Sequence, residues 1–315
     1  MPLPNDETLL KLSEETLSQF AELFGKHPGL RPVHPKGVLL SGTFKPTPEA
    51  ANISTAPHFN NPSTPITVRF SNSTGIPEIP DTDPNANPRG FAIRFNLGHR
   101  VHTDIIAHAA PGFPTRTGED FLEFIKAVAA SPPGSSSPTA VEKFLESHPA
   151  ALAFSQLPKP FPTSLATQDY FGVHAFKFTN AEGVSTFGRY IITPDAGISH
   201  LDEEKELKSK SSTYLFDELP ERIAKGGPFS FTLHIQIPKD GDVIDDSTVQ
   251  WPKDRPVIEL GKLTVDAVLP NNDAEQKYII FDPIPRVQGV EPSDDPLLEF
   301  RAAVYLISGR RRRAA

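Results

Sequence analysis

The sequence predicts an α+β fold in which helices surround an eight-stranded antiparallel β-barrel. Eight short segments are rich in β-branched and aromatic residues, which favour strands. Several of them are joined by hairpin-like turns, of which TNAEG at 179–183 is the clearest. Segments with apolar residues at helical spacing lie before, between and after the strands, as expected for helices that pack outside a closed barrel.

The first helix is expected over 6–24, where leucine and phenylalanine recur at roughly helical spacing. Asp6 is a suitable N-cap for it and Gly25 a suitable stop. Eight strands are expected to follow, at 37–44, 65–72, 90–96, 102–109, 172–179, 184–193, 229–237 and 257–269. A closed barrel of this size can hold one ligand or dock one against its wall.

Four further helices are expected, at 118–130, 138–147, 212–225 and 295–308. Thr117 is the expected cap of the first of them. Ser137 is the expected cap of the second, with Pro138 as its first residue. The third is expected to end at Gly226, because glycine favours the conformation that terminates a helix.

The length of 315 residues allows one large domain with a sizeable core. We expect a single domain made of three consecutive parts. They are an N-terminal helical segment, a barrel with inserted helices, and a segment that wraps the barrel and ends in the last helix, at 1–29, 30–270 and 271–315.

The composition argues against several classes of function. Lys and Arg number 31 and Asp and Glu 39, so the formal charge of −8 argues against nucleic-acid binding. Without cysteine, no disulfide, thiolate metal site or catalytic thiol can form. We see no signal peptide, no apolar stretch long enough to span a membrane, and no peroxisomal address in the terminal RRRAA. We therefore expect a soluble, cytoplasmic protein.

The last predicted helix carries a pair of residues that could form a metal ligand. Arg301 and Tyr305 are four residues apart and therefore share one face of the helix. A phenol titrates near pH ~10 in model peptides, and a fixed positive charge beside it favours the phenolate. A phenolate is a hard anionic ligand suited to ferric iron. The alternative is a core tyrosine beside an arginine that extends to solvent.

Four motifs occur in one order along the chain: RPVHPKG at 31–37, VRFS at 68–71, PRGFA at 88–92, and FDP followed by GVEPSDDPLLEFRAAVY within 281–305. In this order they resemble the haem catalase family, over about nine-tenths of the chain. The resemblance implies the barrel fold of that family and haem b with ferric iron as the cofactor. It also implies hydrogen peroxide or organic hydroperoxides as substrates.

The resemblance further implies roles for individual residues. Tyr305 would be the proximal iron ligand, as tyrosine is in catalases, and Arg301 would keep it deprotonated. His34 would be the distal acid–base residue, held by a hydrogen bond with Ser71. The other implied residues line the haem pocket or bind the two haem carboxylates, namely Val33, Phe113 and Phe121 in the lining and Arg31, Arg69 and Arg312 on the carboxylates. Part of the arginine run 310–313 is expected to be a solvated tail.

The chain departs from the family pattern in two ways. It ends soon after the tyrosine helix and lacks the family's C-terminal helical domain, so the haem edge is expected to be open to organic donors. Where the family has asparagine in D-L-V-G-N, the chain reads DIIAH and places His108. We expect His108 to be catalytic, because an imidazole can donate a hydrogen bond to a peroxide oxygen and take up a proton near neutral pH. The alternative is a structural His108 that is turned away from the site.

The combined features predict a haem-dependent peroxidase that oxidises small organic donors and has weak catalase activity. One rival is the rearrangement of fatty-acid hydroperoxides by allene oxide synthases, which resemble the chain in the proximal pair but carry threonine where Val33 stands. A non-enzymatic haem binder is a second rival, although storage of haem needs neither His34 nor Ser71. A third, a lipocalin-like barrel, leaves the proximal pair unexplained. We expect no nicotinamide site, and the oligomeric state stays open, with a homodimer as one candidate.

Overall fold

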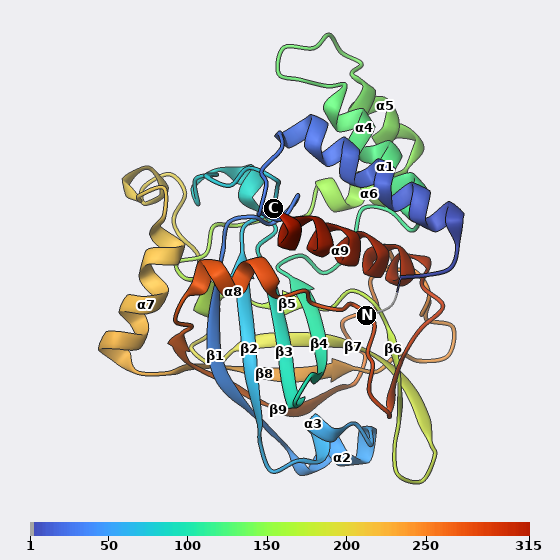
Figure 1. The fold of residues 1–315 in the computed structure, drawn as a ribbon, viewed down its shortest axis with the longest axis vertical. Helices are drawn as coiled ribbons and strands as arrows, with labels where there is room; N and C mark the ends of the chain where they lie inside the picture. The colour runs from blue at the N-terminus through green and yellow to red at the C-terminus, as the bar shows by residue number, and fades with distance from the viewer. Residues whose placement is uncertain (1–2) are drawn as a thin grey trace.

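A computed structural model describes residues 3–315, and Met1 and Pro2, the first residues of the predicted segment 1–29, lie outside the described residues. Eight antiparallel strands close into a barrel in the order β1, β2, β3, β4, β5, β7, β8, β9, with β9 pairing back to β1 (Figure 1). In that order they span Gly37–Pro46, Thr64–Ser71, Gly90–Gly98, Val101–His108, Tyr170–Phe171, Ser185–Pro194, Phe229–Gln236 and Val257–Val268. The predicted eight-stranded antiparallel barrel is confirmed.

The fifth strand differs from its prediction at 172–179. The barrel strand is the two-residue β5, whereas β6 (Phe176–Thr179) pairs with β7 outside the ring and with β10 (Val290–Pro292). Between β5 and β6 the chain leaves the ladder, and His174 there bonds with Asp295, which lies 121 residues later. Local alternation of apolar residues carries no information about such a distant partner. The sequence therefore indicates one strand where the structure has two.

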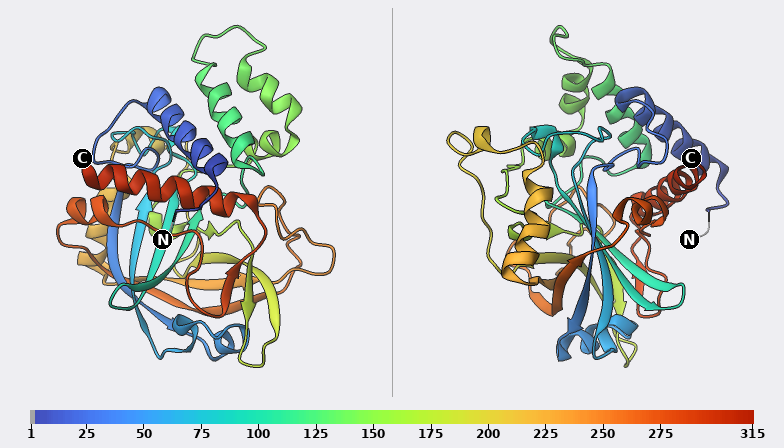
Figure 2. Two further views of the ribbon diagram at one scale, coloured as in Figure 1. Left: turned by 45° about the vertical axis from the view of Figure 1, so that its right-hand side comes forward. Right: turned by 60° about the vertical axis from the view of Figure 1, so that its left-hand side comes forward.

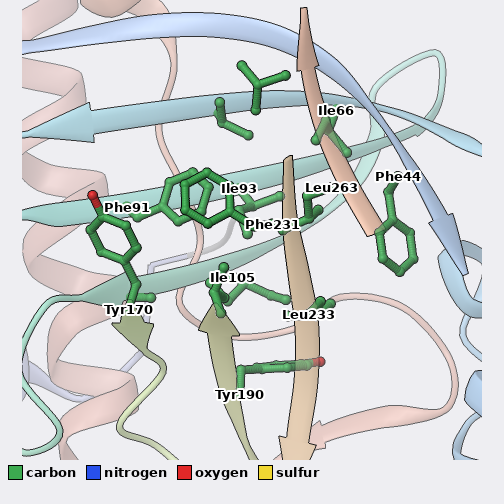
Figure 3. Close-up of a cluster of buried hydrophobic side chains, with 14 of the residues drawn as sticks. Phe44, Ile66, Phe91, Ile93, Ile105, Tyr170, Tyr190, Phe231, Leu233 and Leu263 are labelled. Carbon is green, nitrogen blue, oxygen red and sulfur yellow. The ribbon is translucent and has the colours of Figure 1, made fainter. Parts of the chain in front are cut away.

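The interior of the barrel is a packed core of aromatic and branched side chains that point toward one another (Figure 3). Every second residue of β8 is buried, which is the alternation expected of a strand with one face inward. The rings of Phe70 and Phe91 stack with their centroids 4.4 Å apart, and Phe91 lies 5.1 Å from Phe231. Burying each such ring contributes about 1.5–3 kcal/mol to the free energy of folding. The core thus fixes the strand ends that carry the site.

Helices cover both ends of the barrel (Figures 1 and 2). Helix α9 crosses one end, with α1, α4, α5 and α6 beyond it, while α2 and α3 lie at the opposite end. Helices α1 to α9 span Glu7–Phe24, Pro48–Ile53, Pro57–Asn60, Gly118–Ala129, Ala140–Ser147, Pro149–Ser155, Tyr214–Gly226, Asn272–Tyr278 and Pro296–Ala314. Short 3-10 turns lie at Pro84–Ala86, Leu165–Thr167 and Leu207–Ser209. No helix within residues 3–315 combines the length and the apolar character needed to cross a membrane.

The predicted helices at 6–24 and 118–130 are confirmed together with their caps. The Asp6 carboxylate accepts from the backbone N–H groups of Thr8 and Leu9, and the Thr117 hydroxyl accepts from that of Asp120. These bonds satisfy donors that a helix leaves unpaired in its first turn.

Three other predicted helices have different ends. The prediction of Ser137 as a cap is wrong, because α5 begins at Ala140 after a reciprocal capping box between Thr139 and Glu142. Helix α7 begins at Tyr214 and includes Gly226. Helix α9 continues through the arginine run to Ala314 instead of ending at 308, because three of those arginines bind neighbouring segments.

A buried histidine at the far end of the barrel gives the fold a pH dependence. The His58 ring on α3 lies 4.0 Å from that of Phe59 and 4.4 Å from that of Phe95, measured between centroids. Its Nδ1 atom has no hydrogen-bond partner among the described residues. Burial in this apolar surrounding lowers the pKa of His58 from 6.5 to about 3. The folded state therefore keeps the ring neutral at a pH where the unfolded chain binds a proton.

We predict that acid weakens the fold in part through His58. Between pH 6.5 and 3 the unfolded state holds the extra proton, so stability falls as the pH falls, by up to about 1.4 kcal/mol per pH unit for one such group. The substitution His58→Phe should reduce the pH dependence of the free energy of unfolding by this contribution. Urea unfolding at several pH values between 7 and 4 measures it. The exposed His200→Gln serves as the control, and an unchanged slope in the His58 variant contradicts the assignment.

Candidate active site

A cavity of about 420 Å³ lies between α1, α4, α9 and the ends of β2, β3 and β4. All the site residues that the sequence suggested line it: Arg31, Val33, His34, Arg69, Ser71, His108, Phe113, Phe121, Arg301, Tyr305 and Arg312. Its wall contains many phenylalanines, and no Asp or Glu among the described residues belongs to it. The fold therefore brings the predicted residues together, while their chemical roles stay predictions.

His34 stands before β1 in a strained backbone conformation. Its φ angle is +57°, a left-handed region that costs a non-glycine residue about 1–3 kcal/mol. The N–H of His34 donates to the carbonyl oxygen of Thr74 at 2.7 Å. Arg69 Nη2 donates to the carbonyl oxygen of His34 at 2.8 Å. Hydrogen bonds on both sides of the residue therefore hold it in this conformation.

The His34 imidazole is placed by Ser71 and by the absence of a side chain at Gly90. Nδ1 of His34 lies 3.1 Å from the Ser71 hydroxyl oxygen. Gly90 pairs with Ser71 in the β2–β3 ladder, and a Cβ at Gly90 would lie 2.6 Å from that oxygen and 3.2 Å from Nδ1. The glycine of the PRGFA motif is thus required for the contact between the histidine and the serine.

His34 is neutral at physiological pH. Burial is the main cause, and the positive charges of Arg69, Arg301 and Arg31 add to it, so that its pKa falls from 6.5 to about 3. A neutral imidazole can accept a proton from a bound molecule, which a permanently charged one cannot.

His108 ends β4 and lines the cavity, so it is not turned away from the site. Its Nδ1 accepts a hydrogen bond from the N–H of Ala110 at 3.3 Å, which places the proton of the neutral ring on Nε2. Nε2 is buried without a hydrogen-bond partner within residues 3–315. Burial, then the charge of Arg301, lowers the pKa of His108 to about 3. The expectation that it takes up a proton near neutral pH is therefore wrong.

Tyr305 is the end of a chain of four hydrogen-bonded side chains, of which Tyr305 and Arg301 line the cavity. Arg301 Nη2 donates to the Tyr305 hydroxyl oxygen at 2.9 Å, and Arg301 Nη1 donates to His174 Nε2 at 2.6 Å. Because arginine is only a donor, this ring nitrogen must accept, and the proton of His174 sits on Nδ1. That N–H donates to Asp295 Oδ2 at 2.7 Å. A buried carboxylate thereby fixes the arginine that faces the phenol.

Three other arginines of the cavity meet at the C-terminal end of α8. Arg31 donates to the carbonyl oxygens of Gln276 and Ile279, both at 3.0 Å, and Arg312 donates to that of Ile279 at 2.7 Å. Arg69 Nε donates to the side-chain oxygen of Gln276 at 2.8 Å. The partners of these guanidinium groups within residues 3–315 are neutral, with no carboxylate among them. Burial, and then the charge of a neighbouring arginine, lowers the pKa of each.

Most of the arginine run binds the body of the protein. Arg311 pairs with Glu14 on α1, and Arg313 donates to the carbonyl oxygen of Tyr278. Arg310 is exposed, which agrees with the expectation that part of the run is a solvated tail.

Sequence reasoning missed three residues that orient the site, namely His174, Asp295 and Gln276. Asp295 left a signal, since an aspartate before Pro296 is a typical helix cap, and its carboxylate accepts from the N–H of Leu297. His174 and Gln276 left none, because the residues that they orient lie 127 and 207 positions away in the sequence.

Comparisons with known proteins show what the chain as a whole is similar to. A family model described as Catalase matches residues 15–315. A catalase-related peroxidase of Synechococcus elongatus is 35% identical over 303 residues, which cover 95% of this chain and 88% of that protein. One of Mycolicibacterium paratuberculosis is 34% identical and covers 90% and 89%. The crystal structure of a fungal catalase superposes with a TM-score of 0.81 at 26% identity, and the chain spans 64% of that protein.

We predict that Asp295 stabilises the fold through two separate contacts. Asp295→Ala removes the cap of α9 and leaves the buried N–H of His174 unpaired, which should lower the free energy of unfolding by about 2–5 kcal/mol. Asp295→Ser keeps a cap oxygen and should recover about 1 kcal/mol of that loss. Urea unfolding measures both, with the exposed Asp294→Ala as the control. Equal stability of the Ala and Ser variants contradicts a capping role.

Proposed function

Because the chain belongs to the catalase family, we propose that it is a haem-dependent peroxidase. It reduces hydrogen peroxide or organic hydroperoxides and oxidises small organic donors, with weak catalase activity. The observation that carries the proposal is the convergence on one cavity of a phenol held by Arg301 and a neutral histidine held by Ser71. A catalase-type reaction uses an iron ligand and an acid–base group, and these two side chains supply both.

The residues of the cavity fit haem b with ferric iron. Arg31, Arg69 and Arg312 are largely buried cations without a carboxylate partner within residues 3–315, and haem brings two carboxylates. Guanidinium groups bind carboxylates through paired hydrogen bonds. The aromatic wall, with Val33, Phe113 and Phe121, suits the apolar body of a porphyrin. When bound, haem supplies the redox centre at which a peroxide is reduced.

On the proximal side, Tyr305 would bind the iron through its phenolate oxygen, as tyrosine does in catalases. Arg301 donates a hydrogen bond to that oxygen and brings a positive charge beside it, which favours the anionic ligand. His174 and Asp295 hold Arg301 in place from behind. These three side chains would thus keep the tyrosine ligand oriented without touching the substrate.

On the distal side, His34 would accept a proton from the incoming hydroperoxide and return it to the departing oxygen. Its low pKa keeps it ready to accept at physiological pH. Ser71 fixes the orientation of the ring through Nδ1. His108 would donate a hydrogen bond from its Nε2–H to a peroxide oxygen, which the unpaired state of this buried N–H supports.

The rearrangement of fatty-acid hydroperoxides is the alternative reaction. Val33 lines the cavity where an allene oxide synthase would place a threonine hydroxyl, and its apolar side chain packs in the cluster beneath α1. Peroxidase chemistry is therefore favoured. A hydroperoxide assay separates the two, because a peroxidase consumes a donor for each turnover and a rearrangement needs no reductant.

We predict that Tyr305 is required for the haem spectrum and for activity. The haem-loaded protein should show a high-spin ferric spectrum of the tyrosinate type that changes on addition of hydrogen peroxide. Tyr305→Phe removes the ligand oxygen, so this spectrum should be lost and activity should fall to the level of free haemin. The exposed Tyr278→Phe is the matched control and should behave as the unmodified protein. A wild-type spectrum and activity in Tyr305→Phe would refute the assignment.

We predict that His34 acts on the proton and not on haem binding. His34→Ala should slow the reaction with hydrogen peroxide by about 10²–10⁴-fold, the usual contribution of a positioned acid–base group. Haem affinity, measured by absorbance titration, should stay within a few-fold of the unmodified protein because other residues hold the cofactor. The exposed His99→Ala is the control. Loss of haem from His34→Ala makes the residue structural or an iron ligand.

A further inference from the structure

Arg69 connects the end of the cavity where Arg31 and Arg312 meet α8, called here the carboxylate end, to the backbone of His34. Its guanidinium is buried on β2, with the side chain of Gln276 on one side and the chain at His34 and Pro35 on the other. Nη2 donates to the carbonyl oxygens of His34 at 2.8 Å and Pro35 at 3.2 Å. Arg31 and Arg312, at the same end of the cavity, bind carbonyl groups of the α8 end instead.

The loop after His34 is shaped to admit this guanidinium. A Cβ at Gly37 would overlap Nη2 of Arg69 and would come within 2.6 Å of the carbonyl oxygen of Phe70. Gln276 extends the same contact, because its side-chain nitrogen donates to the carbonyl oxygen of Gly37 at 3.0 Å. The glycine of the RPVHPKG motif thus leaves space for one particular arginine.

His34 needs such a support because its backbone is in the left-handed region, which persists in a non-glycine residue only where surroundings impose it. Thr74 holds the N–H side of the residue and Arg69 holds the carbonyl side. Nη1 of Arg69 makes no hydrogen bond with residues 3–315, and Arg69 lines the cavity. One amino group of Arg69 therefore faces the histidine backbone while the other is free for a ligand.

We propose that Arg69 is a positioning residue for His34. One amino group of Arg69 holds the His34 carbonyl, and the other holds a haem carboxylate. Occupation of the carboxylate end of the cavity then steadies the imidazole that handles the proton. This role rests on the proposed function for its haem half, whereas the contact with His34 belongs to the protein alone.

The charges around His34 agree with this role. Arg69, Arg301 and Arg31 face it as cations, His108 faces it as a neutral ring, and Ser71 bonds its Nδ1. Arg69 is the strongest of the three cations in lowering the pKa of His34. A carboxylate bound to Arg69 offsets that charge, so loading of the cavity should raise the pKa of the imidazole.

The test compares Arg69→Gln with Arg31→Gln, which removes a cation from the same end of the cavity without touching the His34 backbone. In the haem-free protein, hydrogen exchange of the His34 amide should accelerate about tenfold or more in Arg69→Gln, because opening of the loop becomes easier. It should change less than about twofold in Arg31→Gln. Both variants should bind haem more weakly, as judged by absorbance titration.

A second readout uses potassium cyanide on the haem-saturated proteins, since hydrogen cyanide must give up its proton as it binds. Association should be slowed at least about tenfold more by Arg69→Gln than by Arg31→Gln, with a shifted pH profile. If Arg69→Gln folds poorly, Arg69→Lys takes its place. It keeps the charge with a single ammonium and should show an intermediate loss. Equal amide exchange and equal cyanide rates in the two Gln variants overturn the role of Arg69. Failure of the unmodified protein to bind haem overturns the proposed function instead, and the exchange experiment still decides the contact with His34.

Discussion

The gathering of positive charge around one cavity is the constraint on which the rest of the site depends. Four guanidinium groups, those of Arg31, Arg69, Arg301 and Arg312, line a wall that has no acidic residue within the described part of the chain. Such charges are costly to take out of water unless hydrogen bonds or anions compensate them. The chain compensates three of them with neutral oxygens, several of them carbonyls at the negative end of α8. The two carboxylates of the proposed haem would compensate part of the remaining positive charge.

The histidines of the site differ in their protonation and hydrogen bonding because their surroundings differ. His34 and His108 are buried beside cations and stay neutral, so one can accept a proton and the other can donate its fixed N–H. His174 is also buried but bonds with the carboxylate of Asp295, and that bond decides which of its nitrogens carries the proton. Three residues of one type thus present different donor and acceptor atoms because charge and hydrogen bonding differ around each ring.

Sequence reasoning reached the barrel and the residues of the cavity because their signals are local. Strands such as 229–237 alternate, helix caps such as Asp6 precede their helices, and short motifs carry His34, Ser71 and Tyr305. The split of the fifth strand, the bond of His174 with Asp295 and the hold of Arg69 on His34 had no local signal. Each of these features depends on a partner that is distant in the sequence. The two partners come together only when the barrel closes.

The last helix shows how a segment that is apolar nearly all round can still organise polar chemistry. Arg301, Tyr305, Ser308 and Arg312 all line the cavity, at intervals of four, three and four residues. This spacing follows the helical period, so the four side chains form one stripe that extends over about 16 Å. Leu297, Phe300, Val304 and Ile307 lie in the apolar cluster shared with α1 and α4. Because one inserted residue would turn the stripe by about 100°, the apolar packing of α9 sets the direction of the phenol together with Arg301.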